Sequence, residues 1–217
     1  NTVLGYQSLN ANTTGNSNVS VGVRALQANT TGNRLTALGY NALNASTTSS
    51  DNTAIGSLAL LSNTTGANNT AVGSDALRLN TTGSENTAVG YGALETNSTG
   101  NYNVALGRQA LNANTTASNN TVVGFQAGYS NTTGANNVAL GRGALYANTT
   151  GNDSQAIGYN ALSLQTTGGA NSVVGSYALS SNTTGAFNVA FGNQALQANS
   201  TASNNTAVGY QAGYTNT

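Results

Sequence analysis

The chain has 217 residues and few charged side chains, five Arg against five Asp or Glu, for a formal net charge of zero. Cys, His, Pro, Met, Trp and Lys are absent, whereas Asn occurs 36 times and Thr 32 times. This composition excludes thiolate chemistry, the commonest general base and metal ligand, and the charge field that attracts nucleic acid or anionic lipid.

A strict repeat organises the chain from end to end. A Gly preceded by a large apolar residue recurs at every seventeenth position, with no insertion or deletion, so that the chain holds 12 complete repeats and one partial repeat. These glycines are Gly5, Gly22, Gly39, Gly56, Gly73, Gly90, Gly107, Gly124, Gly141, Gly158, Gly175, Gly192 and Gly209. We expect residues 1–217 to form a single β-solenoid domain and to be a segment of a longer fibre.

Each repeat predicts one rung of an all-β, parallel β-solenoid, also called a β-roll. The unit is too short for the two helices of a helical repeat, but it accommodates two short β-compatible runs with a turn after each. One unit buries little on its own, so successive units must stack in register. Equivalent residues of successive repeats then lie above one another, which predicts ion pairs between Arg34 and Asp51 and between Arg78 and Glu95.

The first element of each repeat is the strand that ends just before the Gly, and its last two positions are both apolar in every repeat except the second, which has Ser20. Adjacent strand residues point to opposite faces, so one position should face the core and the other a second cover. We assign the larger residues, directly before Gly, to a core ladder: Leu4, Val21, Leu38, Ile55, Val72, Val89, Leu106, Val123, Leu140, Ile157, Val174, Phe191 and Val208.

The smaller residues of the same strand, two positions before Gly, are assigned to an oligomer face covered by other copies of the chain. The members of this predicted face are Ala71, Ala88, Ala105, Ala139 and Ala156. The first and last repeats resemble the central ones and carry no atypical polar cap. We therefore expect a homo-oligomer, preferably a trimer, that can extend end to end into a filament.

The second apolar run is the Ala and Leu at the third and fourth positions after the Gly. The Leu is expected to be buried, and two repeats break the rule with Gly128 and Gly213. A Tyr follows each of these glycines, and we expect the rings of Tyr129 and Tyr214 to fill the missing volume.

The return loop of each repeat carries Asn-Thr-Thr-Gly or a close variant. Turn geometry and ladders of identical side chains account for Asn and Thr here. N-linked glycosylation is the alternative, because Asn-x-Ser/Thr sequons occur in 10 of the 12 complete loops. The candidate glycosylation sites are Asn12, Asn29, Asn63, Asn80, Asn97, Asn114, Asn131, Asn148, Asn182 and Asn199.

Five tyrosines share the position directly after the Gly. They either cover a corner of the coil or present a surface on which a sugar or a receptor stacks. These residues are Tyr6, Tyr40, Tyr91, Tyr159 and Tyr210.

The acidic residues offer no catalytic or metal-binding arrangement. Asp51, Glu85 and Asp153 share one position of the repeat but lie two and four rungs apart, too far for a carboxylate pair. We expect no enzyme, no catalytic residue, no cofactor, no metal site and no nucleic-acid partner. No run of about 18 apolar residues predicts a membrane span.

The Asn-Thr-Ala-Val-Gly-x-x-Ala-Leu unit, seen at Asn86 to Leu94 and with Ile for Val at Asn52 to Leu60, resembles the head repeats of trimeric autotransporter adhesins and related repeats of phage tail fibres. The resemblance covers all 13 units. It implies a left-handed parallel β-roll that assembles as a trimer, and an extracellular fibre on a cell surface or a virion tail. A receptor or glycan on a target surface would be its partner.

Two functions remain open at this point. The first is a structural and adhesive fibre segment that presents a rigid, repetitive surface for attachment. The second is an ice-binding β-solenoid, since regular Thr arrays on a flat β face can order water.

Overall fold

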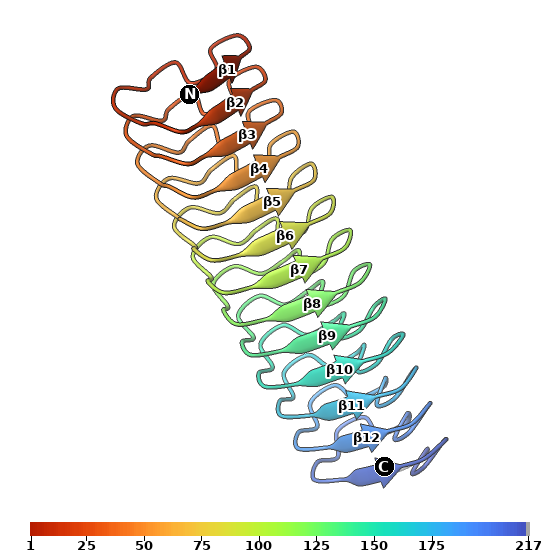
Figure 1. The fold of residues 1–217 in the computed structure, drawn as a ribbon. Helices are drawn as coiled ribbons and strands as arrows, with labels where there is room; N and C mark the ends of the chain where they lie inside the picture. The colour runs from red at the N-terminus through yellow and green to blue at the C-terminus, as the bar shows by residue number, and fades with distance from the viewer. Residues whose placement is uncertain (216–217) are drawn as a thin grey trace. The chain divides into compact units, whose positions relative to one another are not determined.

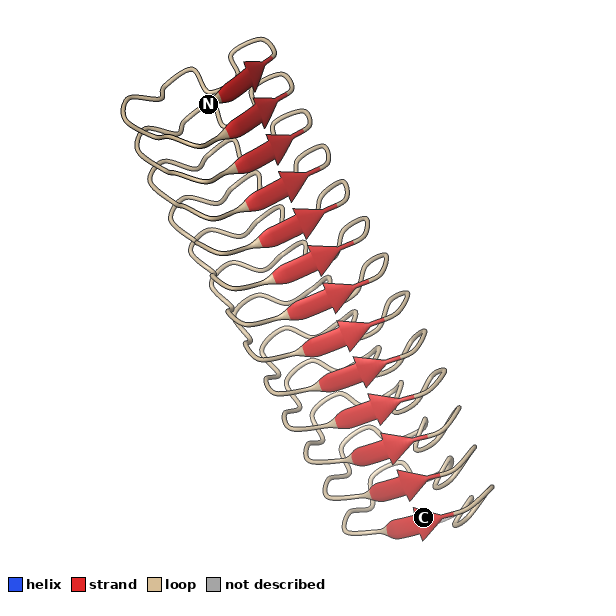
Figure 2. Cartoon of the chain, viewed as in Figure 1, coloured by secondary structure: helices blue, strands red, loops and turns tan. Residues whose placement is uncertain are grey.

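The computed structural model describes residues 1–215, which contain short strands and no helix (Figures 1 and 2). Two compact units divide the chain, Asn1–Arg108 and Gln109–Thr217. The first unit contains β1 (Thr2–Leu4), β2 (Val19–Val21), β3 (Thr36–Leu38), β4 (Thr53–Ile55), β5 (Thr70–Val72), β6 (Thr87–Val89) and β7 (Val104–Leu106). The second contains β8 (Thr121–Val123), β9 (Val138–Leu140), β10 (Gln155–Ile157), β11 (Ser172–Val174), β12 (Val189–Phe191) and β13 (Thr206–Val208).

Within each unit, successive strands pair in parallel and in register. In the first unit Thr70 lies beside Thr87, and every other paired residue likewise lies beside its equivalent in the next repeat. The second unit follows the same rule, as in the pairing of Ala139 with Ala156. The predicted parallel β-solenoid with one rung per repeat is therefore confirmed.

The two faces of the strand are the reverse of the prediction. The residues two positions before Gly point into the coil and, between the first and last rungs, are completely buried in the single chain, so they are not available to other copies. The predicted oligomer face of Ala71, Ala88, Ala105, Ala139 and Ala156 is therefore wrong.

The larger residues directly before Gly point outward, so the predicted core ladder is also wrong. Leu4, Leu38, Val89, Ile157, Phe191 and Val208 are exposed, and Val21, Ile55, Val72, Leu106, Val123, Leu140 and Val174 are half-buried. The physical reason is the narrow cross-section of so short a coil, in which the opposite side already contributes a buried Leu from every regular rung. Only a small side chain then fits on the inner face of most strands.

The buried Ala–Leu run after the Gly is confirmed as the apolar core. The leucines at this position are almost fully buried, as predicted for Leu94 and Leu145. Leu94 has φ 52° and Leu145 φ 54°, in the left-handed region that a bulky residue seldom occupies. The left-handed backbone of this turn directs the Leu side chain into the coil. The strain of this conformation is offset by the burial of the Leu.

The two glycines that replace this Leu are compensated from inside the coil. A Cβ atom on Gly128 would lie 3.4 Å from methyl carbons of both Leu111 and Val122. Val122 is one of the few larger residues on the inner strand face, and it supplies the volume that the missing Leu leaves. Tyr129 instead stacks on the exposed Tyr146, with ring centroids 5.3 Å apart. Leu111 and Val122 therefore take up the missing Leu volume, and the prediction that the Tyr129 ring covers it is wrong.

The last repeat carries the second of these glycines, and there the ring of Tyr214 is predicted to cover the missing Leu volume. A Cβ atom on Gly213 would lie 2.9 Å from a methyl carbon of Leu196, so Leu196 occupies that space. Tyr214 is 39% exposed.

Two ladders of buried asparagines fill the rest of the interior. In the return-loop ladder, Asn80 Nδ2 donates to Asn63 Oδ1 at 2.8 Å and to the Gly83 carbonyl at 2.9 Å. In the second ladder, just before each strand, the Asn69 backbone N–H donates to Asn52 Oδ1 at 2.8 Å and its Nδ2 donates to the Gly83 carbonyl at 2.9 Å. Both ladders thus link successive rungs through buried amides, and these have their partners except at Asn182, whose Oδ1 is buried without one.

This interior position contradicts the glycosylation alternative. Nine of the ten candidate asparagines are at most 1% exposed: Asn29, Asn63, Asn80, Asn97, Asn114, Asn131, Asn148, Asn182 and Asn199. The tenth, Asn12, is half-buried, and its Nδ2 donates to the Gly15 carbonyl at 3.0 Å. A glycan on these amides is incompatible with the fold, whereas the ladder interpretation of the Asn residues is confirmed.

Two departures from the Asn ladders form a matched pair in adjacent positions of the interior. Ser154 is shorter than the Asn of its column, and Gln165 is longer than the Asn of the other column. Gln165 Nε2 lies 3.3 Å from Ser154 Oγ, and its Oε1 accepts from Asn171 Nδ2 at 2.8 Å. Around this pair the interior therefore keeps both its volume and its hydrogen bonds.

The two predicted ion pairs between rungs are confirmed, which fixes the register independently of the backbone. Arg34 Nη2 donates to Asp51 Oδ2 at 2.8 Å, and Arg78 Nη2 lies 2.6 Å from Glu95 Oε1. Arg78 also reaches Asp75 at 3.4 Å. The hydrogen bond from Arg34 lowers the pKa of Asp51 and, reciprocally, raises the pKa of Arg34.

Replacing the buried Leu111 by Ala should lower the free energy of unfolding by about 2–5 kcal/mol, because it opens a cavity in the core. The control is Leu140→Ala on the outer face of the same unit, which should cost about 1 kcal/mol. Urea denaturation followed by circular dichroism measures both. Equal losses would mean that the outward residues carry the core after all.

Replacing Asn80 by Ala should cost about 1–3 kcal/mol, since it leaves the buried Asn63 Oδ1 without its donor and removes one of the two amide donors to the Gly83 carbonyl. Thr82→Ala, at an exposed position of the same loop, should change the free energy of unfolding by less than about 0.5 kcal/mol. Thermal and urea unfolding of the two variants test this difference. A neutral Asn80→Ala variant would contradict a stabilising role of the ladder.

NMR titration of the Asp51 carboxyl should give a midpoint below its ordinary value. Because the pKa is lowered in the folded state, the stability from the pair is complete above the unfolded pKa and is lost as pH falls through the folded pKa. Arg34→Gln should return the midpoint towards the ordinary value. Arg24→Gln, which removes the same charge from a site beside Gln7, should leave it unchanged.

Candidate functional site

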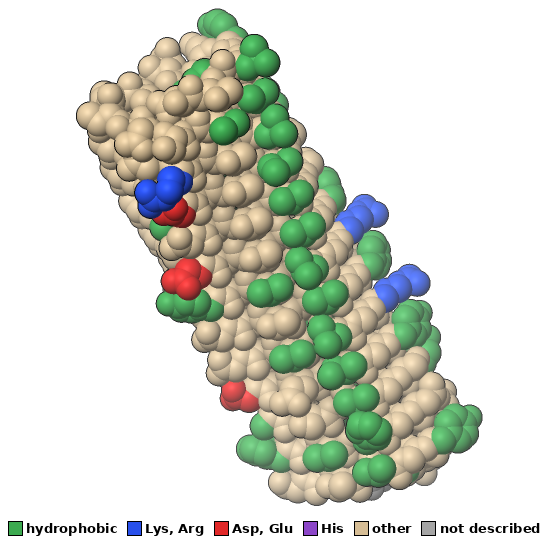
Figure 3. Space-filling view, viewed as in Figure 1, with side chains coloured by type: hydrophobic (Ala, Val, Ile, Leu, Met, Phe, Trp, Pro, Cys, Tyr) green, Lys and Arg blue, Asp and Glu red, His purple; other side chains and the backbone are tan. Residues whose placement is uncertain are grey.

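The outward face of the strands is the first candidate surface. Its outer ladder is the column of large apolar residues directly before each Gly, from Leu4 to Val208. Two positions earlier on the same face runs a second column, mostly Thr or Val, for example Thr53, Thr70 and Thr87. Figure 3 shows the apolar side chains gathered in a line along the strands of each unit, with the charged side chains lying to either side.

This face combines three properties that a surface in water does not usually have together. It is accessible to solvent, since six of the thirteen outer-ladder side chains are exposed, among them Phe191 at 55%, and the other seven are half-buried. It contains no charged residue in either column. It is also regular, because in-register pairing places one apolar side chain in every rung of each unit. A parallel sheet is normally covered on both faces, so this face has the character of a contact surface.

The return loops form a second regular surface of different chemistry. The first Thr of each Asn-Thr-Thr points along the stack, as where Thr64 Oγ1 donates to the Thr81 carbonyl at 3.0 Å. The second Thr is exposed in all 12 complete repeats, for example Thr65 and Thr82. The two Thr residues therefore have different environments, and only one of them presents its side chain fully to solvent.

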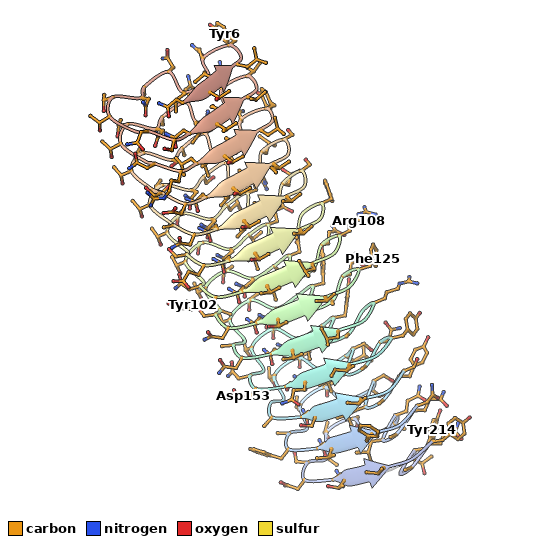
Figure 4. The ribbon with its side chains drawn as sticks, viewed as in Figure 1. Tyr6, Tyr102, Arg108, Phe125, Asp153 and Tyr214 are labelled. Atoms are coloured by element: carbon orange, nitrogen blue, oxygen red, sulfur yellow. The ribbon has the colours of Figure 1, made fainter. Side chains whose placement is uncertain are left out.

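A groove in the second unit is the third candidate site. Phe125, Arg142 and Tyr159 occupy the same position in successive rungs, and the Arg142 guanidinium carbon lies 5.7 Å from the centroid of each ring. The groove encloses about 280 Å³. Figure 4 labels Phe125 on the loop that follows β8. The remaining lining residues are Gln126, Gly143, Tyr146, Asn160, Ser163 and Leu164.

Local departures from the repeat open this groove. Gly143 has φ 65°, and a Cβ atom there would clash with Asn160 Oδ1, so the absence of a side chain admits the Asn160 amide. Tyr159 is fixed from its other side by Tyr177, with ring centroids 5.1 Å apart in an edge-to-face arrangement. The hydrogen bond with Tyr159 raises the pKa of Tyr177 above its ordinary value. The aromatic wall of the groove consists of Phe125, Tyr146 and Tyr159, and contacts with neighbouring side chains hold Tyr159 in place.

The other predicted tyrosines of this position do not form such a site. Tyr6, Tyr40, Tyr91 and Tyr210 are all exposed. Arg108 lies over the Tyr91 ring at 5.7 Å, which repeats the cation–π contact of the groove in the first unit. The groove was not predicted, although its signal is present in the sequence: Phe125 and Arg142 occupy the same position of the repeat as the tyrosines.

The acidic residues stay dispersed on the coil. Asp153 accepts a hydrogen bond from Asn136 Nδ2 at 3.0 Å. Among residues 1–215, no group of three or more Asp, Glu, His or Cys side chains has an arrangement that could hold a metal ion. The same residues include no helix long and apolar enough to cross a membrane.

Comparisons with protein-family models, with curated proteins and with solved structures find no match to this chain. The functional argument therefore starts from the three surfaces: the outer ladder, the Thr-rich return loops and the aromatic groove.

Proposed function

We propose that this chain is a structural and adhesive segment of an extracellular fibre, assembled from copies of itself through the outer ladder. The exposed, uncharged and regular face of the strands is the single observation that carries the proposal. Covering such a face with a second copy is favourable, at about 25 cal/mol for each Å² of apolar surface removed from water.

A closed homotrimer is the preferred assembly. Three copies arranged about an axis bury all their outer ladders against one another and leave no outer ladder exposed. An open arrangement would leave one exposed at each end, to which further copies could bind. In-register rungs favour this arrangement, since every rung offers a large apolar side chain at the same point of the turn. End-to-end stacking of rungs would extend the assembly into a filament.

The rest of the surface fits a role in attachment at a bacterial surface or on a virion tail fibre. The return loops and the corners after the strands remain outside such a trimer and present a repetitive array of exposed Thr, with Tyr at several corners, to a receptor or glycan. The proposal assigns the chain no catalytic reaction and no cofactor. It follows the resemblance to adhesin head repeats but is carried by the outer ladder.

Ice binding is the second candidate, and the outward strand face now favours it more than the sequence alone did. Thr53, Thr70 and Thr87 share this face with the aliphatic outer ladder, two positions away along each strand. The rungs are about 4.8 Å apart and the two columns about 7 Å apart, which makes a flat two-dimensional array of methyl and hydroxyl groups. A monomer with this face uncovered would be the form that binds ice.

Placing Arg at Val72 and Val89 of the outer ladder should dissociate the assembly, because it would bury unpaired positive charge between copies. The matched control is Thr82→Arg with Thr99→Arg, which adds the same charge to exposed loop positions of the same two repeats. Light scattering measures the mass, and circular dichroism checks that the β content is unchanged. The wild type and the control should keep the mass of a trimer, and the outer-ladder variant that of a monomer.

A wild-type chain that stays monomeric at high concentration would contradict the fibre proposal. Thermal hysteresis measured on the same samples then tests the second candidate. Hysteresis in the wild type that disappears in the Val72→Arg, Val89→Arg variant but persists in the loop control would identify the strand face as an ice-binding plane.

A further inference from the structure

We infer that the groove between Phe125 and Tyr159 binds an acidic saccharide, with the carboxylate of a uronate residue on Arg142 and the pyranose ring against the aromatic wall. This inference gives a ligand class to the attachment role proposed above and rests on it. It concerns the loops after the strands, and its residues differ from those of the outer ladder.

The first step is the charge of Arg142. The second unit contains a single acidic residue, Asp153, which accepts a hydrogen bond from Asn136. Figure 4 shows Asp153 across the coil from Phe125. Among the described residues, the ion pairs join Arg34 to Asp51 and Arg78 to Asp75 and Glu95, and none involves Arg142. The groove therefore carries a positive charge without a carboxylate of its own.

The second step is the fixed position of this charge. The guanidinium lies 5.7 Å from the ring centroids of both Phe125 and Tyr159, one rung before and one rung after it. Stacking against the rings orders the long side chain before a ligand arrives, which lowers the entropy cost of binding. The N–H groups lie in the guanidinium plane, and their fork matches the two oxygens of a carboxylate.

The third step is the character of the remaining wall. Tyr146 and Leu164 are exposed apolar surfaces, and Gln126, Asn160 and Ser163 supply amide and hydroxyl groups around them. A pyranose ring has an apolar C–H face and a rim of hydroxyls, and so it matches both kinds of neighbour. The volume of about 280 Å³ suits one or two sugar rings. A small inorganic anion would use Arg142 but leave the aromatic wall bare.

The test uses trigalacturonate and its fully methyl-esterified form, which differ in charge but share their sugar rings. Binding to the 217-residue chain is followed by calorimetry and by chemical-shift changes of backbone amides. Trigalacturonate should shift the amides of residues around Arg142 and Asn160. The ester should bind at least about tenfold more weakly, a difference of about 1.4 kcal/mol.

Arg142→Gln should reduce trigalacturonate affinity about tenfold and leave ester affinity unchanged. Arg24→Gln is the matched control, since it removes one positive charge at an exposed residue in the other unit, and it should bind like the wild type. Tyr146→Ala should weaken the acid and the ester alike, because it removes wall rather than charge. Unchanged amide spectra away from each substitution confirm that the variants fold.

Four outcomes overturn the inference: no binding of trigalacturonate, equal binding of acid and ester, equal loss in Arg142→Gln and Arg24→Gln, or shifts confined to residues outside the groove. Light scattering on the same samples keeps this result separate from the fibre proposal. An assembled wild type that ignores trigalacturonate rejects the ligand class alone, and a monomer that binds it rejects the assembly alone.

Discussion

The close stacking of one glycine on the next is the constraint on which the rest of the structure depends. Gly73 has φ 131°, and a Cβ atom on it would lie 2.7 Å from the carbonyl oxygen of Gly90 in the next rung. No other residue fits this contact without moving the backbone. The glycines thus hold the chain at the same point of every turn, and the strand before them and the Ala–Leu corner after them follow in register.

The asparagine ladders make this register selective as well as compact. A core of this width made only of Ala and Leu would resist a slip between rungs less strongly, since apolar contacts have no required direction. A slip would leave the Asn63 and Asn52 amides without their partners in the next rung, at a cost for each unmet hydrogen bond. The polar interior therefore opposes mispairing, while the leucines supply most of the apolar burial.

The repeat, the parallel register, the ion pairs and the buried Leu column followed from the sequence because each depends only on spacing. Which face of the strand points inward did not follow from the sequence. Both of the last two strand positions are apolar in nearly every repeat, so the alternation of side chains does not show which one is buried. Size then misled the assignment: Val89 is larger than Ala88, but the space opposite the strand was already filled by Leu. The burial of Asn80 was missed because an Asn-Thr-Thr-Gly segment reads as a surface loop, and only the coil geometry turns its first side chain inward. The aromatic groove could not be predicted from the sequence, because its recognition requires the positions of the side chains around Arg142 in the folded chain.

The same stacking limits how a chain of this kind can change in length. A single inserted residue would displace every later glycine, amide and ion pair from its partner, whereas gain or loss of a whole turn leaves every contact type intact. The sequence carries a trace of such growth, because Asn112 to Tyr129 and Gln197 to Tyr214 are near copies that lie five turns apart. Gene segments encoding whole turns are thus interchangeable parts, and recombination between them can lengthen or shorten the protein without a new folding problem.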